Sequence, residues 1–273
     1  MKRVMGFLGV ICVLLANVAV AGELGNPAQL IKQGQFDAGF QWTSAFKQGF
    51  EDYDLRRTYS DGTQDPGRKG ADFESDQYYM ATVTYGILDQ LNAFVRLGMV
   101  DGGRWLDYEP GNSWKANLDS QFVWAVGAKG TIYEFENGLG LGLAAQYLRY
   151  DGRKVKDWRC TDTGEAARDL GWATDDAIDY WQLDAMATAY WRIGAFRPYV
   201  GAGYTYYDVD YKGKWTHEDP LYGGIDYDAS FSNQNRFTAL VGLDMDLGMN
   251  LKANIQGTFV SSTALTVGIS YCF

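Results

Sequence analysis

The strongest constraint on the fold of this chain is an alternation of apolar and polar residues with a period of two, which begins near Gln35 and continues to the C-terminal residue. Side chains with this period lie on opposite faces of a β-strand, whereas a helix repeats every 3.6 residues. We predict ten strands, at approximately residues 34–46, 76–88, 91–101, 118–133, 138–150, 178–192, 197–210, 231–246, 249–260 and 263–273.

The connections between these strands alternate in length. Four are long and polar, at residues 47–75, 102–117, 151–177 and 211–230, and the connections at the other strand ends are turns of a few residues. In an up-and-down barrel this alternation places all long loops at one rim, as in outer-membrane proteins. Strands can cross the hydrocarbon of a membrane only as a closed barrel, because every backbone polar group must be paired within the protein. The sequence therefore predicts an all-β fold: a single-domain transmembrane antiparallel up-and-down β-barrel of about ten strands over residues 34–273, with short periplasmic turns and long extracellular loops.

The first 21 residues have the composition of a secretory signal peptide. Lys2 and Arg3 precede an apolar stretch from Phe7 to Leu15, and small residues follow at positions 19–21. We expect cleavage before Gly22 and a short periplasmic segment over residues 22–33. The remaining cysteines, at positions 160 and 272, are expected to be free thiols, because an exported disulfide framework would use more of them.

The last strand alternates apolar and aromatic residues and ends on an aromatic side chain: Leu265, Val267, Ile269, Tyr271 and Phe273. This pattern resembles the C-terminal signal by which the barrel assembly machinery recognises Gram-negative outer-membrane β-barrel proteins. The resemblance implies export to the cell outer membrane, with the assembly machinery, outer-membrane lipid and lipopolysaccharide as partners. Aromatic side chains would then mark the headgroup level, and the candidates are Trp42, Tyr79, Trp124, Tyr147, Trp181, Trp191, Tyr204 and Tyr271.

Composition excludes several other classes of protein. The chain carries 24 Lys and Arg against 34 Asp and Glu, for a formal net charge of −10, which argues against nucleic acid as a partner. One histidine and three scattered cysteines cannot assemble a zinc site of ordinary ligand spacing. We therefore expect no metal and no cofactor.

The interior of a ten-stranded barrel is only slightly wider than that of an eight-stranded barrel, which side chains just fill. The inward parity carries ten candidate lumen charges: Asp37, Arg96, Asp119, Lys129, Asp184, Arg192, Arg236, Asp244, Asp246 and Lys252. Such charges can neutralise one another in a plugged lumen, or they can form the constriction of a narrow pore. The sequence thus predicts either a narrow or gated pore for ions and small solutes or a structural, surface-exposed barrel with a plugged lumen.

The long loops offer alternative functions. Their mixed charge predicts a solvated hydrophilic cap, and a surface adhesin or receptor could act through it. The strand count and tall loops also resemble the omptin family of surface proteases, which implies a histidine and aspartates that activate water at the outer rim. His217 has Glu218 and Asp219 beside it, but the acids follow the histidine, opposite to the omptin order. We expect that the chain is not an enzyme.

Overall fold

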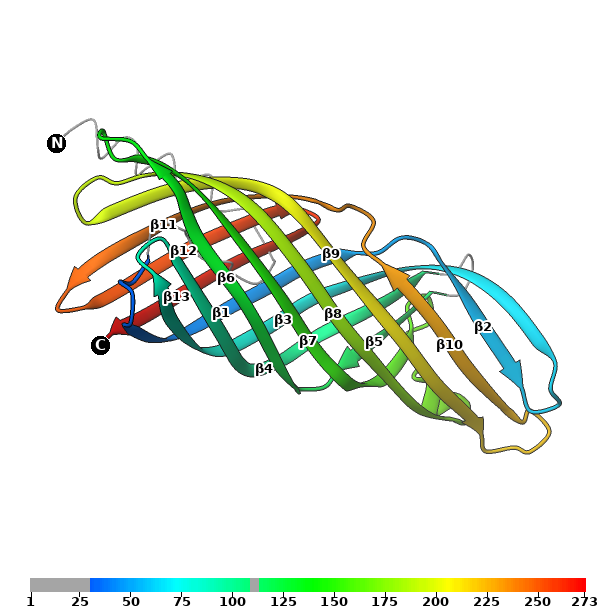
Figure 1. Cartoon of the computed structure of the whole chain (residues 1–273). Coiled ribbons are helices and arrows are strands. Elements are labelled where there is room, and N and C mark those ends of the chain that lie inside the picture. Colours follow the sequence, from blue (N-terminus) through cyan, green and yellow to red (C-terminus); the bar gives the residue numbers. More distant parts are fainter. Residues whose placement is uncertain (1–29, 109–112) are drawn as a thin grey trace.

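The computed structural model describes residues 30–108 and 113–273, apart from the side chain of Arg68 (Figure 1). The predicted signal peptide and most of the 22–33 segment lie outside the described residues. Thirteen strands and one short 3-10 helix, η2 (Ala167–Leu170), make up the described chain. The strands are β1 (Phe36–Gly49), β2 (Tyr53–Tyr59), β3 (Gln64–Leu88), β4 (Leu91–Tyr108), β5 (Trp114–Leu118), β6 (Gln121–Glu134), β7 (Leu139–Cys160), β8 (Trp172–Trp191), β9 (Phe196–His217), β10 (Gly224–Ser232), β11 (Phe237–Gly248), β12 (Leu251–Val260) and β13 (Ser262–Cys272).

Ten of these strands close a barrel. Its order is β1-β3-β4-β6-β7-β8-β9-β11-β12-β13, and β13 pairs with β1 again, with every neighbour antiparallel. Trp42 of β1, for example, lies opposite Tyr79 of β3 and Val267 of β13. The predicted ten-stranded antiparallel up-and-down barrel is confirmed.

The outer end differs from the prediction, because the four long connections are largely strands. β3 is 25 residues long, and β7 and β9 are 22 residues each, well beyond the predicted segments. The added strands β2, β5 and β10 complete a second closed ring in the order β2-β3-β4-β5-β7-β8-β9-β10, in which β10 pairs with both β9 and β2. Figure 1 shows this eight-stranded extension at the end of the molecule opposite the C-terminus and the start of β1.

The extension forms because alternation continues into the predicted loops. In β2 the residues Tyr53 and Leu55 face inward and are buried, while Asp54 and Arg56 are exposed. A bulge between Tyr150 and Arg153 changes which residues of β7 face inward, from even-numbered before it to odd-numbered directly after it. A prediction that continues one alternation past this point no longer matches the strand. The long connections are therefore mostly sheet, with a charged outward face and a buried inward face.

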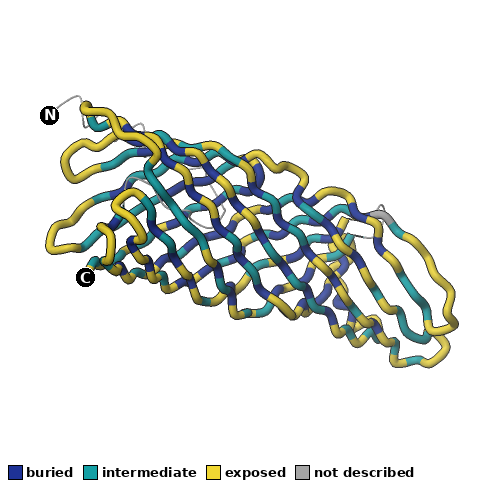
Figure 2. Tube along the Cα trace, in the orientation of Figure 1, coloured by how far each residue is buried: buried dark blue, intermediate teal, exposed yellow. Residues whose placement is uncertain are grey.

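The outward surface of the barrel carries an apolar belt with a sharp outer edge. In β8 the outward residues from Trp181 to Trp191 are apolar, and the outward residues beyond Trp181 include Asp179 and Asp175. β9 changes in the same way, from outward Tyr206 to outward Asp208. The stretch from Trp181 to Trp191 is 11 residues long, which is within the roughly 9–11 residues that a tilted strand needs to cross the hydrocarbon. Figure 2 shows the regular alternation of buried and exposed residues along the strands.

Aromatic side chains line both edges of this belt. At the outer edge, ring contacts connect Trp124 with Tyr147, Tyr147 with Trp181, and Trp181 with Tyr206. At the opposite end, Tyr271 contacts Phe273, the final residue of the predicted assembly signal. No helix in residues 30–108 and 113–273 is long and apolar enough to cross a membrane.

Residues 30–33 contact the barrel at the end opposite the ring extension. Ile31 is buried, and the amide of Asn92 on β4, oriented to satisfy its bonds, donates to the Ile31 carbonyl at 3.2 Å and accepts from its N–H at 2.9 Å. The backbone N–H of Gln33 donates to Asp89 in the β3–β4 turn at 2.9 Å. The end of the predicted periplasmic segment is thus fixed to the barrel. Cys160 and Cys272 are free, as predicted.

Candidate functional site

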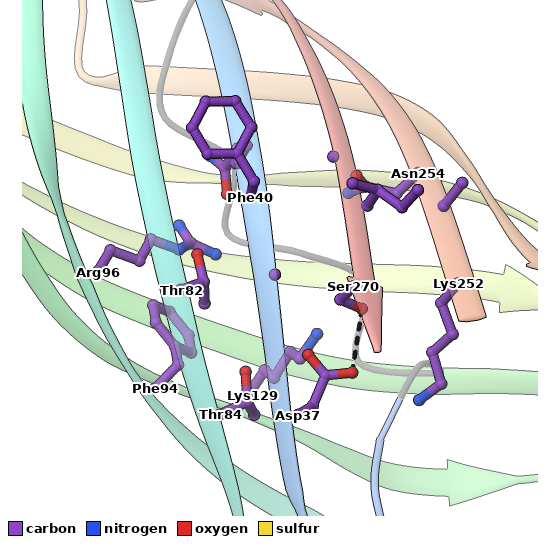
Figure 3. Close-up of a pocket in the computed structure, with 15 residues that line it drawn as sticks. Asp37, Phe40, Thr82, Thr84, Phe94, Arg96, Lys129, Lys252, Asn254 and Ser270 are labelled. Carbon is purple, nitrogen blue, oxygen red and sulfur yellow. Dashed lines mark hydrogen bonds between the residues drawn. The ribbon is translucent and has the colours of Figure 1, made fainter. Parts of the chain in front are cut away.

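At the end of the barrel opposite the ring extension, the lumen contains a small charged cavity. Its volume is about 60 Å³, and Asp37, Arg96, Lys129 and Lys252 line it (Figure 3). Asp37 accepts a hydrogen bond from the Ser270 hydroxyl at 3.0 Å. A space of this size holds a few water molecules and no larger solute.

Six of the ten candidate lumen charges lie inside the barrel, and four do not. The six inside are Asp37, Arg96, Lys129, Asp184, Asp244 and Lys252. Two of the remaining four lie at the rim opposite the ring extension, in ion pairs of Arg192 with Glu134 at 2.7 Å and of Asp246 with Arg197 at 4.0 Å.

The other two charges are corrections to the predicted lumen set. Asp119 lies in the break between β5 and β6 and pairs with the exposed Lys156. Arg236 precedes β11 and stacks over the outward ring of Tyr206 at 5.2 Å. The sequence predicts both inside the lumen only if the alternation of inward residues continues across a point where the strand is in fact interrupted.

Above the small cavity, a hydrogen-bonded network fills the lumen. Arg96 donates to Gln146 at 2.7 Å, and Gln146 donates to Asp184 at 3.0 Å. Asp184 also accepts from Gln182 at 2.8 Å and from Thr205 at 2.7 Å. Asp184 thus accepts hydrogen bonds from three side chains, which offset the cost of burying its charge.

A tyrosine layer lies directly above this network. Tyr180 donates to Gln182 at 2.7 Å, stacks on Tyr150 with centroids 4.9 Å apart, and contacts Tyr207 at 6.0 Å. The Tyr207 hydroxyl lies 3.0 Å from the carbonyl oxygens of Gly49 and Ser261. All three tyrosines are buried, so rings from three strands occupy the cross-section of the barrel.

The same level holds a buried ion pair that the sequence analysis missed, between Arg153 of β7 and Asp76 of β3. The exposed fractions of their side chains are 0% and 1%, and Nη2 of Arg153 lies 2.9 Å from Oδ1 of Asp76. The guanidinium also donates to the carbonyl oxygens of Gly102 at 2.5 Å and Asp119 at 2.7 Å. Gly103 makes the approach possible, because its φ is +87° and a Cβ there would lie 1.9 Å from Oδ1 of Asp76.

Asp76 is the first residue of a predicted strand and Arg153 lies in the predicted connection 151–177, so the candidate lumen set includes neither. The only sequence signal was the Gly102-Gly103 pair, both of which have positive φ and the first of which lies opposite Asp76.

The outer ring encloses a second, larger cavity, which we call the outer pocket. Its volume is about 360 Å³, and each of the eight strands of the ring contributes at least one residue to its wall. The lining is mostly aromatic: Tyr53, Leu55, Arg57, Tyr59, Lys69, Asp107, Trp114, Trp158, Trp172, Tyr211, Trp215, Ile225 and Tyr227. Buried rings of Phe73, Trp105 and Phe231 pack below it, so apolar packing separates it from the tyrosine layer.

Two carboxylates lie at the wall of the outer pocket or just behind it. Asp107 accepts from Lys69 at 2.5 Å and from the hydroxyl of Tyr53 at 3.3 Å. Asp176 accepts from the indole N–H groups of Trp158 at 2.5 Å and Trp215 at 3.0 Å. Burial raises the pKa of Asp176 to about 6, against the opposing effect of these two indole donors.

His217, the residue behind the omptin resemblance, is part of the β8–β9 tip. Its Nε2 donates to the carbonyl oxygen of Leu170 at 3.0 Å, and its Nδ1 accepts from the backbone N–H of Asp219 at 3.0 Å. Its ring contacts those of Trp172 at 4.8 Å and Tyr222 at 4.5 Å. Backbone groups thus occupy both ring nitrogens, and the geometry gives this histidine a structural role.

Comparisons with solved structures return outer-membrane β-barrels. The chain is similar to the outer-membrane protein OprG of Pseudomonas aeruginosa, at 12% identity and a TM-score of 0.47 over 89% of this chain and 97% of that one. It is similar to the outer-membrane protease OmpT of Escherichia coli, at 13% identity and a TM-score of 0.49 over 91% and 100%. The translocator domain of the autotransporter NalP of Neisseria meningitidis matches at 12% identity and a TM-score of 0.44 over 88% and 89%. No protein-family model and no curated protein sequence matches.

Proposed function

We propose that the chain is an integral outer-membrane barrel that does not conduct and that acts at the cell surface through its eight-stranded outer end. The observation that carries the proposal is the filled lumen. Three successive layers, the Arg96–Asp184 network, the tyrosine layer and the aromatic packing beneath the outer pocket, consist of buried side chains.

The charge arrangement supports a plug. The Arg153–Asp76 pair is buried, Gln146 links Arg96 to Asp184 by hydrogen bonds, and Asp244 lies opposite Arg197 in the register of β11 and β9. Charges that serve a conducting constriction face water, whereas Asp76, Asp184 and Asp244 are almost completely buried.

The position in the membrane follows from the belt. The apolar outward residues between two aromatic girdles fit a lipid bilayer, and the charged outward face beyond Trp181 fits water. We place the ring extension outside the cell, because the predicted signal peptide and C-terminal assembly signal would leave both termini in the periplasm. The proposal gives His217 no catalytic role.

The test is single-channel conductance of the refolded mature chain, residues 22–273, in a planar bilayer. We expect no steps from protein shown to be folded by a difference in gel migration between boiled and unboiled samples. Stable steps whose ion selectivity changes in Arg96→Gln or Lys252→Gln would overturn the plug and establish the narrow-pore alternative. Arg104→Gln is the control, since Arg104 pairs with Glu74 on the outer surface.

A further inference from the structure

The outer pocket has the construction of a ligand site. Pockets for small molecules are concave, largely apolar, and carry a few placed polar groups, with volumes of about 300–1,000 Å³. The outer pocket, at about 360 Å³, fits the small end of this range. It forms only when all eight strands of the ring are in place, and the same strands hold it rigid by cross-strand pairing.

The aromatic walls favour a ring. Trp114 contacts Trp215 at 5.6 Å, Trp172 contacts Trp215 at 6.1 Å, and Tyr227 contacts Trp215 at 5.6 Å, so these rings surround one side of the space. The N–H of Trp215 is already bonded to Asp176, which leaves the apolar ring surface for packing. Aromatic rings bind flat partners in offset or edge-to-face arrangements.

The charged residues of the wall favour an acid. Arg57 and Lys69 are its cations, and Asp107 is its carboxylate. Lys69 and Asp107 are both buried and lie 2.5 Å apart, so they neutralise each other. Arg57 is 15% exposed and lies 3.4 Å from Asp65, whose side chain is 51% exposed, so water screens that pair on its outer side.

From this arrangement we propose that the outer pocket binds a small ring-bearing organic anion, with the ring packed among Trp114, Trp172 and Tyr227 and the acid group on the guanidinium of Arg57. The proposal deepens the surface role proposed above and rests on the outer end being exposed to the medium. A cationic ligand would meet the positive charge of Arg57. A fully apolar one would place hydrocarbon against the guanidinium and gain no charge-assisted hydrogen bond from it.

The ring can come from an aryl acid or from a sugar acid, because both present a flat face about one ring wide and a carboxylate. Isothermal titration calorimetry of the refolded barrel in nanodiscs, with 4-hydroxybenzoate and glucuronate as probes, separates the two sources. Their neutral counterparts are 4-hydroxybenzamide and glucose. We expect saturable 1:1 binding of one acid, at least tenfold tighter than its neutral counterpart.

Two variants and a control test the assigned roles. Arg57→Gln is expected to weaken binding of the acid at least tenfold and to leave binding of the neutral counterpart unchanged. Trp172→Leu is expected to weaken both. Arg104→Gln, on the outer surface of β4 in the same ring, is expected to change neither.

The absence of saturable binding of either acid by folded protein would overturn the inference, as would an Arg57→Gln variant that binds the acid as tightly as the unchanged protein. Neither result depends on conductance. A silent bilayer without acid binding therefore refutes this inference alone, whereas conducting protein refutes the plug.

Discussion

Removal of Arg153 is expected to destabilise the barrel by about 3–5 kcal/mol, the usual cost of leaving one member of a buried ion pair alone. The guanidinium is fully buried, and its Nε and Nη2 donate to Asp76 and to the carbonyls of Gly102 and Asp119. Arg153→Met keeps most of the apolar stem but leaves a buried carboxylate and two carbonyl oxygens without this donor. Arg153→Lys is expected to retain part of the stability, because one ammonium group cannot reproduce the planar fork that reaches all three acceptors.

The measurement is equilibrium unfolding in urea of the barrel refolded into lipid vesicles, followed by tryptophan fluorescence and by gel migration. A double-mutant cycle with Asp76→Leu isolates the pair, and the double variant is expected to lie close to the unchanged protein, since both buried charges are gone. Arg104→Met, which breaks an exposed pair of 3.2 Å, is expected to cost no more than about 1 kcal/mol. The reasoning is refuted if Arg153→Met costs as little as the Arg104 control, or if the cycle shows no coupling.

Three further substitutions have expected outcomes. The pKa of Asp176 is about 6 in the folded protein and near 3.8 in the unfolded chain. The folded protein therefore holds this proton more tightly, which adds about 3 kcal/mol to the free energy of unfolding below about pH 4. This contribution is lost as the pH rises through 6. Asp176→Asn should abolish that part of the pH dependence, so parallel urea-midpoint profiles of the two proteins from pH 4 to 7 would contradict it. A Cβ at Gly140 would lie 2.1 Å from the ring of Tyr190, so Gly140→Ala should lower stability by about 1–3 kcal/mol, and an unchanged urea midpoint would show that the ring moves freely. His217→Ala should speed amide exchange at the β8–β9 tip without changing the global midpoint; a peptide-cleaving activity lost in this variant would instead support the omptin-like alternative.

The alternation of residues is sufficient to predict the barrel within the membrane. Outward positions such as Trp181 and Leu183 must be apolar to meet lipid, and strand length there is set by bilayer thickness, so the pattern is strict. Asp37, Arg96, Asp184 and Asp244 could be placed inside for the same reason, because each lies in an uninterrupted strand of the barrel.

The pattern fails where strands are interrupted. The bulge after Tyr150 reverses the parity of β7 and brings Arg153 inward, while the break between β5 and β6 leaves the side chain of Asp119 with an exposed lysine. Polar outward residues in the extension looked like loops because water, not lipid, surrounds them. The inward residues of the same strands, among them Tyr211, Trp215 and Tyr227, are aromatic. Extending the search for alternation into the predicted loops would have found them.

The sequence by itself determines a membrane barrel, because lipid on the outside and a closed sheet in the wall restrict each strand to one repeating pattern. Only the tertiary structure decides what the lumen and the outer end contain. β2 and β10 are more than 160 residues apart in the chain and become neighbours because the β12–β13 hairpin ends near Ser261 and leaves a gap that they close. Arg153 and Asp76 likewise meet although they are 77 residues apart in the chain, and no local pattern specifies a contact that depends on where the other strands end.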